Sequence, residues 1–160
     1  MKEISLTQGY TALIDDEDFA NVSSRKWRAQ KVKGGHIYAV SGSHPRVLLL
    51  HRVLLGITDS NIDVDHKDRN GLNCQRANLR VCSAGENLGN QAKTRTYRGK
   101  PTSSRFKGVS KERGKWCAAF RYKRIGLFSS EEDAARAYDR AALEYYGPFA
   151  LTNFLIEATA

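Results

Sequence analysis

Residues 115–146 place the strongest constraint on the fold, because a two-residue repeat of side chains gives way there to a helical repeat. From Trp116 to Lys123, the even positions hold Trp, Ala, Phe and Tyr, and the odd positions hold Cys, Ala, Arg and Lys. This alternation is typical of a β-strand that carries aromatic side chains on one face and basic side chains on the other. With its flanking residues it predicts a three-stranded antiparallel sheet within residues 105–128.

A single helix is expected after this sheet. Ser129 and Glu132 fit a capping box, in which two side chains bond to each other's backbone amides at a helix start. Gly147-Pro148 is typical of a helix end. Small and aromatic side chains recur between these points at helical spacing, so that one stripe of the helix can lie close to the sheet: Ala134, Ala137, Tyr138, Ala141 and Tyr145.

Basic side chains are concentrated in one block of the chain. The net charge is +9, and residues 92–128 hold 12 of the 26 lysines and arginines but only one of the 17 acidic residues. A concentrated positive block favours a polyanionic partner. The plainer alternative is a charged face that contacts only solvent.

Length and composition limit the class of protein. The 160 residues suit one domain of ordinary size or two small ones. No apolar run approaches the roughly 20 residues that cross a bilayer, and the start lacks the pattern of a signal peptide. We therefore expect a cytoplasmic protein with no membrane contact and no obligate protein partner.

The three cysteines are Cys74, Cys82 and Cys117. An odd number of cysteines without a secretion signal argues against a disulfide framework. The lack of a Cys-x-x-Cys pair argues against a structural zinc site. We expect all three to behave as small, partly buried hydrophobic residues.

Residues 1–56 are predicted to form short strands. Four segments have strand-forming side chains, and clusters of glycine, serine and proline separate the later ones. These segments are Leu6–Ile14, Trp27–Ala29, Ile37–Val40 and Val47–His51.

Residues 64–87 predict a strand, a loop, a second strand and a helix. Val64-Asp65-His66 reads as the first strand and Leu79–Cys82 as the second, and Asn70-Gly71 between them favours a tight turn. Two strands followed by a helix within about 30 residues can bring polar side chains from both ends of the unit together.

The helix of this unit begins at a second capping box, formed by Ser83 and Glu86, and carries Asn87 in its first or second turn. Asp65, His66 and Asn87 can then converge, and these residue types suit the hydrolysis of phosphodiester bonds. Carboxylate and amide oxygens are the hard ligands that Mg²⁺ (or Mn²⁺) prefers. A neutral histidine can take a proton from the attacking water near physiological pH. The alternative is that Asp65-His66 is only a surface turn beside a strand.

The stretch from Leu50-His51-Arg52 through Asn90 resembles the HNH, or ββα-metal, nucleases of phage and intron homing endonucleases. Three of its runs match the family pattern: Asp65-His66, Asn78-Leu79-Arg80 and Glu86-Asn87. Asn78 follows His66 by 12 residues and Asn87 follows it by 21. Such spacing is like that of the intron-encoded members, which carry asparagine instead of the final histidine.

The resemblance implies a role for each matched residue. His66 would be the catalytic general base, Asp65 and Asn87 the metal ligands, and Asn78 the residue that holds the loop and the histidine in place. His51 is expected to have a structural role more readily than a catalytic one. The run Asn73-Cys74-Gln75-Arg76 departs from the Asp-Asn-Arg type of the family and leaves the contacts of this loop open.

Residues 104–154 resemble the plant ethylene-response-factor (Apetala-type) DNA-binding domain. The resemblance is carried by Phe106–Val109, Gly114–Arg121, Ile125–Phe128, Glu132–Ala142 and Asn153-Phe154. It implies a three-stranded sheet laid in the major groove of DNA with the helix behind it.

The resemblance also implies which residues face DNA. Arginine can read guanine with two hydrogen bonds in the major groove, whereas lysine more often contacts phosphate. Arg113 and Arg124 stand where plant domains have tryptophan, so the plant target sequence does not carry over. The candidates for the groove are Lys107, Arg113, Arg121, Lys123 and Arg124, and those for phosphate are Lys111 and Lys115.

The sequence therefore predicts an α+β protein in three parts. Residues 1–93 form a nuclease domain, in which a small β-rich N-terminal region leads into a ββα-metal unit. Residues 94–103 form a basic linker, and residues 104–160 form a sheet-and-helix DNA-binding domain. The predicted function is that of a site-specific endonuclease, of the homing kind, that cuts double-stranded DNA with one divalent metal ion in a bacterial or phage-infected cell.

Two other functions compete with this one. A non-catalytic DNA-binding regulator could retain the nuclease part as a scaffold, although it would have no need for an intact Asp65-His66-Asn87 set. An RNA-binding protein fits less well, because the aromatic side chains alternate on the face opposite the basic ones, whereas proteins that bind single strands expose their stacking platforms.

Overall fold

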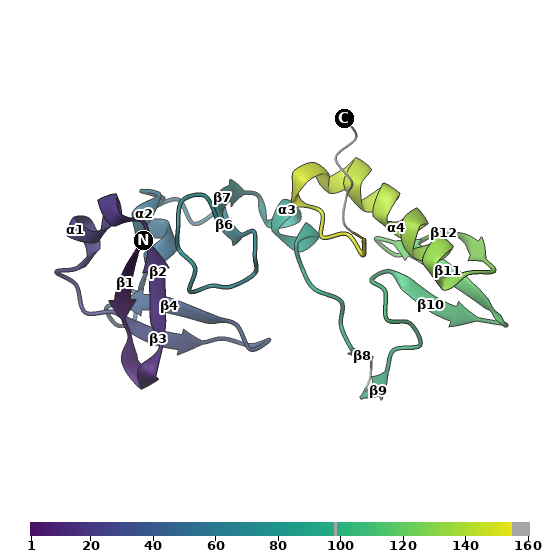
Figure 1. Ribbon diagram of the computed structural model, residues 1–160, viewed down its shortest axis with the longest axis horizontal. Coiled ribbons are helices and arrows are strands. Elements are labelled where there is room, and N and C mark those ends of the chain that lie inside the picture. Colours follow the sequence, from purple (N-terminus) through teal and green to yellow (C-terminus); the bar gives the residue numbers. More distant parts are fainter. Residues whose placement is uncertain (98, 155–160) are drawn as a thin grey trace. The chain divides into compact units, whose positions relative to one another are not determined.

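The computed structural model describes residues 1–97 and 99–154, arranged in two compact units (Figure 1). Unit 1 is Met1–Asn87 and unit 2 is Leu88–Ala160. Both units are mixtures of small antiparallel sheets and a few helices, as the α+β prediction requires. Arg98 of the predicted linker and residues 155–160 of the predicted second domain lie outside the described part. Among the described residues, no helix is long and apolar enough to span a membrane.

Unit 1 begins with a two-stranded sheet of β1 (Lys2–Ser5) and β2 (Thr11–Ile14). The prediction of one strand over residues 6–14 is wrong in its first half. The chain turns back at a short 3-10 helix, Thr7–Gly9, in which Gln8 and Gly9 have φ angles of 63° and 74°. A second 3-10 helix, Asp16–Asp18, leads into α1 (Phe19–Val22).

The second sheet of unit 1 has the strand order β3-β4-β5. The strands β3 (Arg28–Lys31) and β4 (Ile37–Ser41) confirm two predicted segments, but β5 contains only Leu48–Leu49. The predicted strand Val47–His51 is therefore wrong at its end, because α2 already begins at Leu50 and runs to Leu54. Leu50 and Leu54 lie four residues apart and are both buried, so the helix covers the core with one face.

Next come β6 (Asp63–His66) and β7 (Leu79–Cys82), which pair antiparallel with Asp65 opposite Arg80. The helix α3 (Ala84–Gly89) follows directly. Its predicted capping box is confirmed: the Glu86 carboxylate accepts from the Ser83 amide at 2.8 Å, and the Ser83 hydroxyl accepts from the Glu86 amide at 3.3 Å.

The loop between β6 and β7 is fixed to the N-terminal strands of unit 1. The Leu13 amide donates to Leu72 O and the Cys74 amide donates to Leu13 O, both at 2.8 Å. Arg76 forms a two-pronged contact with the buried Asp18 carboxylate, at 2.9 and 2.7 Å. These contacts occupy the run in which the sequence departs from the family pattern, and they anchor Cys74 within the main core of the unit.

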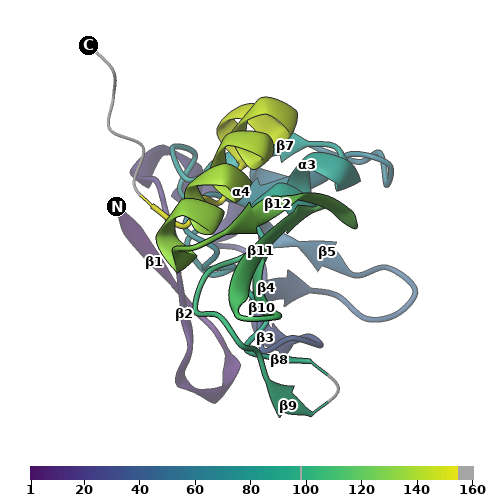
Figure 2. The same cartoon turned by 90° about the vertical axis from the view of Figure 1, so that its right-hand side faces the viewer.

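Unit 2 contains the sheet and the helix that the alternating pattern predicted (Figures 1 and 2). Its strands β10 (Val109–Glu112), β11 (Lys115–Phe120) and β12 (Lys123–Phe128) pair antiparallel in that order. The helix α4 (Glu131–Tyr146) packs on the sheet, and a 3-10 turn, Gly147–Phe149, follows it. A separate small ribbon, β8 (Thr96–Tyr97) with β9 (Lys100–Pro101), lies within the predicted linker.

Two details of unit 2 correct the sequence predictions. The cap of α4 is Ser130, whose hydroxyl accepts from the Asp133 amide, so the predicted capping box at Ser129 is wrong by one residue. The strand alternation stops at Phe120, because Arg121 and Tyr122 form the turn to β12 with φ angles of 47° and 65°. Both central residues of a tight hairpin turn of this kind have positive φ.

Close packing on α4 holds the sheet and the end of the described chain together. Gly108 has φ +73°, and a Cβ there would lie 1.8 Å from the Tyr138 ring, so no other residue fits. The buried Asp139 carboxylate accepts from the amides of Asn153 and Phe154, at 2.8 and 3.1 Å. Asn153 in turn accepts from the Lys107 amide at 2.6 Å.

Candidate functional site

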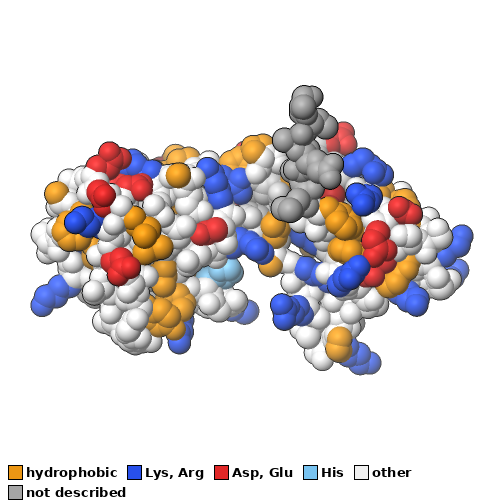
Figure 3. All heavy atoms as spheres, viewed as in Figure 1, with side chains coloured by type: hydrophobic (Ala, Val, Ile, Leu, Met, Phe, Trp, Pro, Cys, Tyr) orange, Lys and Arg blue, Asp and Glu red, His pale blue; other side chains and the backbone are white. Residues whose placement is uncertain are grey.

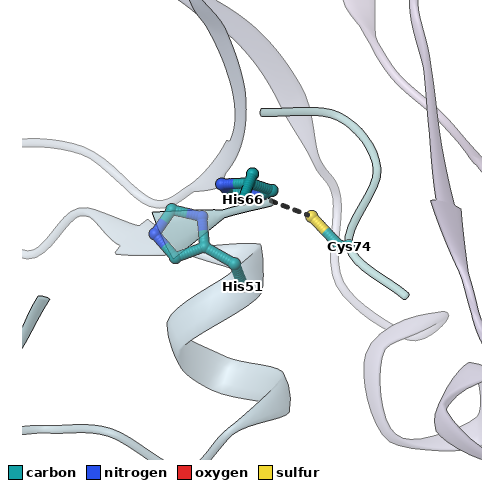
Figure 4. A group of neighbouring side chains, drawn as sticks. All are labelled: His51, His66 and Cys74. Carbon is teal, nitrogen blue, oxygen red and sulfur yellow. Dashed lines mark hydrogen bonds between the residues drawn. The ribbon is translucent and has the colours of Figure 1, made fainter. Parts of the chain in front are cut away.

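His66, the last residue of β6, is buried beside the ring of His51, the half-buried ring of Tyr38 and the thiol of Cys74. The centroid of its ring is 4.9 Å from that of His51 on α2 and 5.9 Å from that of Tyr38 on β4. Its Nε2 is 3.9 Å from the Sγ atom of Cys74, which comes from the loop between β6 and β7 (Figure 4). Residues that are far apart in the sequence therefore fix the orientation of this imidazole.

Burial controls the protonation of this cluster. It lowers the pKa of His51 from 6.5 to about 3, with smaller contributions from His66 and Arg52. Burial also lowers the pKa of His66, and this outweighs the opposite effect of the Asp68 and Asp65 carboxylates. Both imidazoles are therefore neutral at physiological pH, the form in which a histidine accepts a proton or binds a metal ion.

Asp65 precedes His66 on β6, and successive side chains of a strand point to opposite faces. Its carboxylate is buried and binds Arg80 of β7, with 2.7 Å from Oδ2 to Nε and 2.6 Å to the terminal nitrogen. Both nitrogens contact the same oxygen, Oδ2, and this charge-assisted contact holds that oxygen in place. The structure thus places the predicted metal ligand on a rigid strand pair, in contact with a guanidinium that sequence reasoning did not single out.

Asn87 of α3 reaches the same side of β6 as Asp65. Its amide nitrogen donates to the Asp63 carboxylate at 3.2 Å, and Asp63 and Asp65 share one face of the strand because they are two residues apart. The pKa of the nearby Cys82 thiol rises to about 11, first through burial and then through the charges of Asp65, Asp63 and Glu86. Carboxylates therefore gather around this side of the unit, which suits a cation.

Asn78 holds the loop that follows His66. Its amide group donates to the Asp68 carboxylate at 3.0 Å and to Asn73 O at 2.7 Å, while its oxygen accepts from the Asp68 amide at 3.1 Å. Burial opposes ionisation of Asp68, but hydrogen bonds from Asn70, Asn73 and Asn78 outweigh it and lower the pKa of this carboxyl. The loop is thus ordered by its own side chains.

Sequence reasoning missed Tyr38, Cys74, Arg80 and Asp63. Periodicity could not indicate Tyr38, because this residue reaches the site from a different sheet. The glycine of Asn70-Gly71 was the one indirect sign of a close neighbour, since a Cβ on Gly71 would lie 2.7 Å from the Tyr38 ring. Cys74 was expected to be only a small hydrophobic residue, Arg80 belonged to a matched run but was given no role, and Asp63 lies one residue before the predicted strand.

The basic candidates of unit 2 do not form one surface. Trp116 and Ala118 face α4, so Lys115 and Ala119 lie on the opposite face of the sheet, and Arg124 is opposite Ala119 on the neighbouring strand. Arg124 also contacts Glu112 at 3.3 Å. Lys115 and Arg124 therefore lie on the outer face, where an open groove-binding surface was predicted.

The remaining candidates lie elsewhere on unit 2. Arg121 stacks on the Tyr145 ring of α4 at 4.2 Å, and the Nζ atom of Lys111 lies 5.4 Å from the Trp116 ring, so both are on the side of the helix. The Nζ atom of Lys107 donates to Gly89 O at 2.9 Å, and this residue lines a cavity of about 800 Å³. Arg113 and Lys123 are exposed beside the two hairpin turns.

Comparisons with known proteins give two kinds of relative. The chain is 30% identical over 151 residues to an uncharacterised HNH endonuclease of Acanthamoeba polyphaga mimivirus, an alignment that covers 91% of this chain and 76% of the relative. It is also 46% identical over 59 residues to an APETALA2-like protein of Oryza sativa and 39% identical over 59 residues to an ethylene-responsive transcription factor of Arabidopsis thaliana. These plant alignments cover 32% of the chain and only 14% of each relative. No protein-family model and no solved structure matches the chain.

Proposed function

The chain belongs to the HNH endonuclease family, and on that premise we propose that it is a metal-dependent endonuclease that hydrolyses phosphodiester bonds of double-stranded DNA. The observation that carries the proposal is the antiparallel pair β6 and β7 followed directly by α3, the order of elements that a ββα-metal unit requires. His66, whose pKa is lowered by burial, directly follows the Asp65 carboxylate on β6, and Asn87 of α3 reaches the side of this strand that carries Asp63 and Asp65.

His66 is the general base of this proposal. Its neutral imidazole accepts a proton from a water molecule as the water oxygen forms a bond to phosphorus. One ester bond of the phosphate breaks, and the leaving oxygen finally takes a proton from solvent. General-base catalysis of this kind contributes about 10²–10⁴-fold to a rate.

Asp65 and Asn87 are the proposed ligands of Mg²⁺ or Mn²⁺. The donor set fits such an ion, because carboxylate and amide oxygens are hard ligands and Asp63 adds a third oxygen group close to Asn87. When bound, the ion would stabilise negative charge that develops on the phosphate. Arg80 holds the Asp65 carboxylate in position, and Asn78 keeps the loop after His66 in its ordered form.

Unit 2 is the proposed recognition module. Its outer sheet face carries exposed basic side chains, and the APETALA2-like relative supports a role in binding DNA. On the face that Figure 3 shows, lysines and arginines are spread over unit 2 among a few acidic side chains. A recognition module tethered to a nuclease would direct cleavage to a chosen site, as a homing endonuclease requires.

A second function, sequence-specific regulation of DNA without cleavage, is favoured by one observation. The identity to plant AP2/ERF domain-containing proteins, up to 53% over 57 residues, exceeds the 30% identity to the viral endonuclease. In this case unit 1 would serve as a scaffold, and the order that His51, Cys74 and Asn78 impose around His66 would have no chemical use.

Plasmid cleavage separates the two functions. The purified full chain is incubated with supercoiled plasmid and Mg²⁺, with Mn²⁺ in a parallel reaction and with a chelator in a third. The nuclease proposal expects nicked or linear DNA with either metal ion and none with the chelator. Binding to the plasmid without cleavage under any of these conditions would support the regulator instead.

A further inference from the structure

His51, His66 and Cys74 bring three soft donor atoms together inside unit 1. One ligand atom of each residue lies within 4.8 Å of the other two, and all three side chains are buried (Figure 4). The residues come from α2, β6 and the loop between β6 and β7, so the cluster is a property of the fold rather than of a local motif.

We propose that these three residues form a binding site for a thiophilic divalent ion, Zn²⁺, and that zinc at this site switches off the nuclease. The regulatory half of this inference rests on the proposed function. The binding half does not, because it depends only on the three donor atoms.

The distances are close to those of a zinc site. Zinc binds nitrogen at about 2.0 Å and sulfur at about 2.3 Å, so the donors of a tetrahedral site lie about 3.3–3.6 Å apart. The Nε2 atom of His66 and the Sγ atom of Cys74 are already 3.9 Å apart. Small rotations of the side chains would close the remaining gap, and solvent would supply a fourth ligand.

The backbone at Cys74 is held in place for this role. The Cys74 amide donates to Leu13 O, and the preceding Leu72 accepts from the Leu13 amide, so the loop is joined to β2 on both sides of Asn73. His51 is held as a buried residue of the helix α2. A site whose donors are fixed in advance loses little conformational entropy when an ion binds.

The donor set selects a different ion from the one proposed for catalysis. Imidazole and thiolate ligands favour Zn²⁺ over Mg²⁺, whereas the oxygen ligands of Asp65 and Asn87 favour Mg²⁺. Binding requires the Cys74 thiol to release its proton to solvent, since only the thiolate is a strong ligand. Mg²⁺ therefore would not compete effectively at this cluster.

Zinc at His66 is incompatible with general-base catalysis. A neutral imidazole has one nitrogen with a free electron pair and one that carries hydrogen. If Nε2 binds zinc, Nδ1 carries the hydrogen, and the ring has no remaining site that can accept a proton from water. The same conclusion holds whichever nitrogen would otherwise act as the base.

Cobalt binding to the full-length, reduced protein tests the site without any measure of activity. Co²⁺ replaces Zn²⁺ and absorbs in the near ultraviolet when a thiolate is among its ligands. We expect one ion per chain with this absorption, which zinc then displaces. Cys74→Ser and His51→Gln should each weaken binding by at least about 10-fold.

Cys82→Ser is the matched control, because Cys82 is also a buried cysteine of unit 1 but lies outside the cluster. It should bind cobalt like the wild type. Circular dichroism identifies any variant that fails to fold, and the wild-type spectrum alone decides whether a thiolate binds. A wild type without thiolate absorption, or a folded Cys74→Ser that binds equally well, would overturn the proposal.

Cleavage then tests the regulatory half. In Mg²⁺, equimolar zinc should reduce plasmid cleavage by the wild type and by Cys82→Ser, while Cys74→Ser should show the same cleavage with and without zinc. If zinc binds through Cys74 but leaves wild-type cleavage unchanged, the proposed regulation is wrong, whereas the proposed binding site is confirmed. If no protein cleaves at all, the proposed function fails while the cobalt result still decides the site.

Discussion

The two units use their polar side chains in opposite ways. In unit 1 the side chains that could act in catalysis or bind a metal ion are buried: His51, Asp65 and His66 each expose 5–6% of their surface. In unit 2 the buried surface is mainly alanine and aromatic, and basic groups such as Lys115 and Arg124 are exposed. A catalytic group must be oriented before the substrate arrives, whereas a surface that binds DNA must remain accessible to phosphates and bases.

The charges of the units differ in the same sense. Residues 1–87 contain 12 basic and 10 acidic side chains, a net charge of +2, and residues 88–160 contain 14 and seven, a net charge of +7. Attraction to DNA at a distance should therefore come mainly from unit 2. We therefore expect variants of unit 1 to impair cleavage without affecting DNA binding, and variants of the outer sheet face of unit 2 to impair DNA binding.

The largest expected effect is at Asp65. Asp65→Ala removes both the proposed metal ligand and the carboxylate that binds Arg80, and loss of one partner of a buried pair costs about 3–5 kcal/mol of unfolding free energy. Cleavage should disappear. The double variant Asp65→Ala/Arg80→Met should recover stability in urea unfolding but not cleavage, and Glu3→Ala, at an exposed position, should change neither. Recovered cleavage in the double variant would show that Asp65 is only structural.

A comparable but slightly smaller loss of stability is expected at Gly108 in unit 2. Gly108→Ala forces a Cβ into the Tyr138 ring and should cost about 3 kcal/mol or more, measured by denaturant unfolding together with DNA binding. Gly114→Ala is the matched control, because Gly114 also has positive φ but open space around it, and it should cost only about 1 kcal/mol. Equal losses in the two variants would show that backbone conformation, not the contact with Tyr138, requires glycine.

The outer sheet face should contribute smaller effects on binding. If Arg124 reads a base, Arg124→Ala should weaken specific binding by roughly 1–3 kcal/mol and relax specificity at one position. Lys115→Ala should weaken all sequences alike and reduce the slope of log affinity against log salt by about one. Arg140→Ala, an exposed position of α4, serves as the control. If Arg140→Ala lowers DNA affinity as much as Arg124→Ala in a binding titration, the outer sheet face is not the DNA-binding surface.

The most gradual effect is the change in the free energy of unfolding of unit 1 with pH. The pKa of His51 is about 3 in the folded chain and near 6.5 in the unfolded one, so below pH 6.5 only the unfolded state takes up this proton. Stability should therefore be complete above pH 6.5 and fall between pH 6.5 and 3, by about 1.4 kcal/mol per pH unit. In a Trp116→Phe background, the fluorescence of buried Trp27 reports the unfolding of unit 1.

His51→Gln should flatten this pH dependence, and His44→Gln, at an exposed loop position, should not. His66 adds to the slope because burial lowers its pKa as well. A pH dependence that is unchanged in His51→Gln would mean that the histidine cluster is not the cause.

The sequence predicted those parts of the fold that depend on local patterns. The alternation over Trp116–Phe120, the alanine stripe of α4 and the capping box at Ser83 each specify their own element. The errors occurred where tertiary contacts decide: His51 was expected at a strand end, but burial of Leu50 and Leu54 turns this segment into a helix.

The candidate site was predictable only as a set of residues. Spacing within the motif selected Asp65, His66 and Asn87, but it could not show that Asp65 and His66 leave the strand toward different neighbours, Arg80 and His51. Nor could it place Arg121, which the strand period assigned to the basic face. This residue lies at a turn and stacks on Tyr145, because the hairpin closes one residue after Phe120.

The most direct test of the account measures cleavage and binding of one DNA by His66→Ala. Plasmid cleavage in Mg²⁺ should fall by about 10²–10⁴-fold, the contribution of a general base, while the dissociation constant for the same DNA stays at the wild-type value because unit 2 supplies the affinity. His44→Ala, from an exposed loop of the same unit, should match the wild type in both measurements. A His66→Ala protein that cleaves at the wild-type rate, or that loses binding in parallel with cleavage, would contradict the division of chemistry and recognition between the two units.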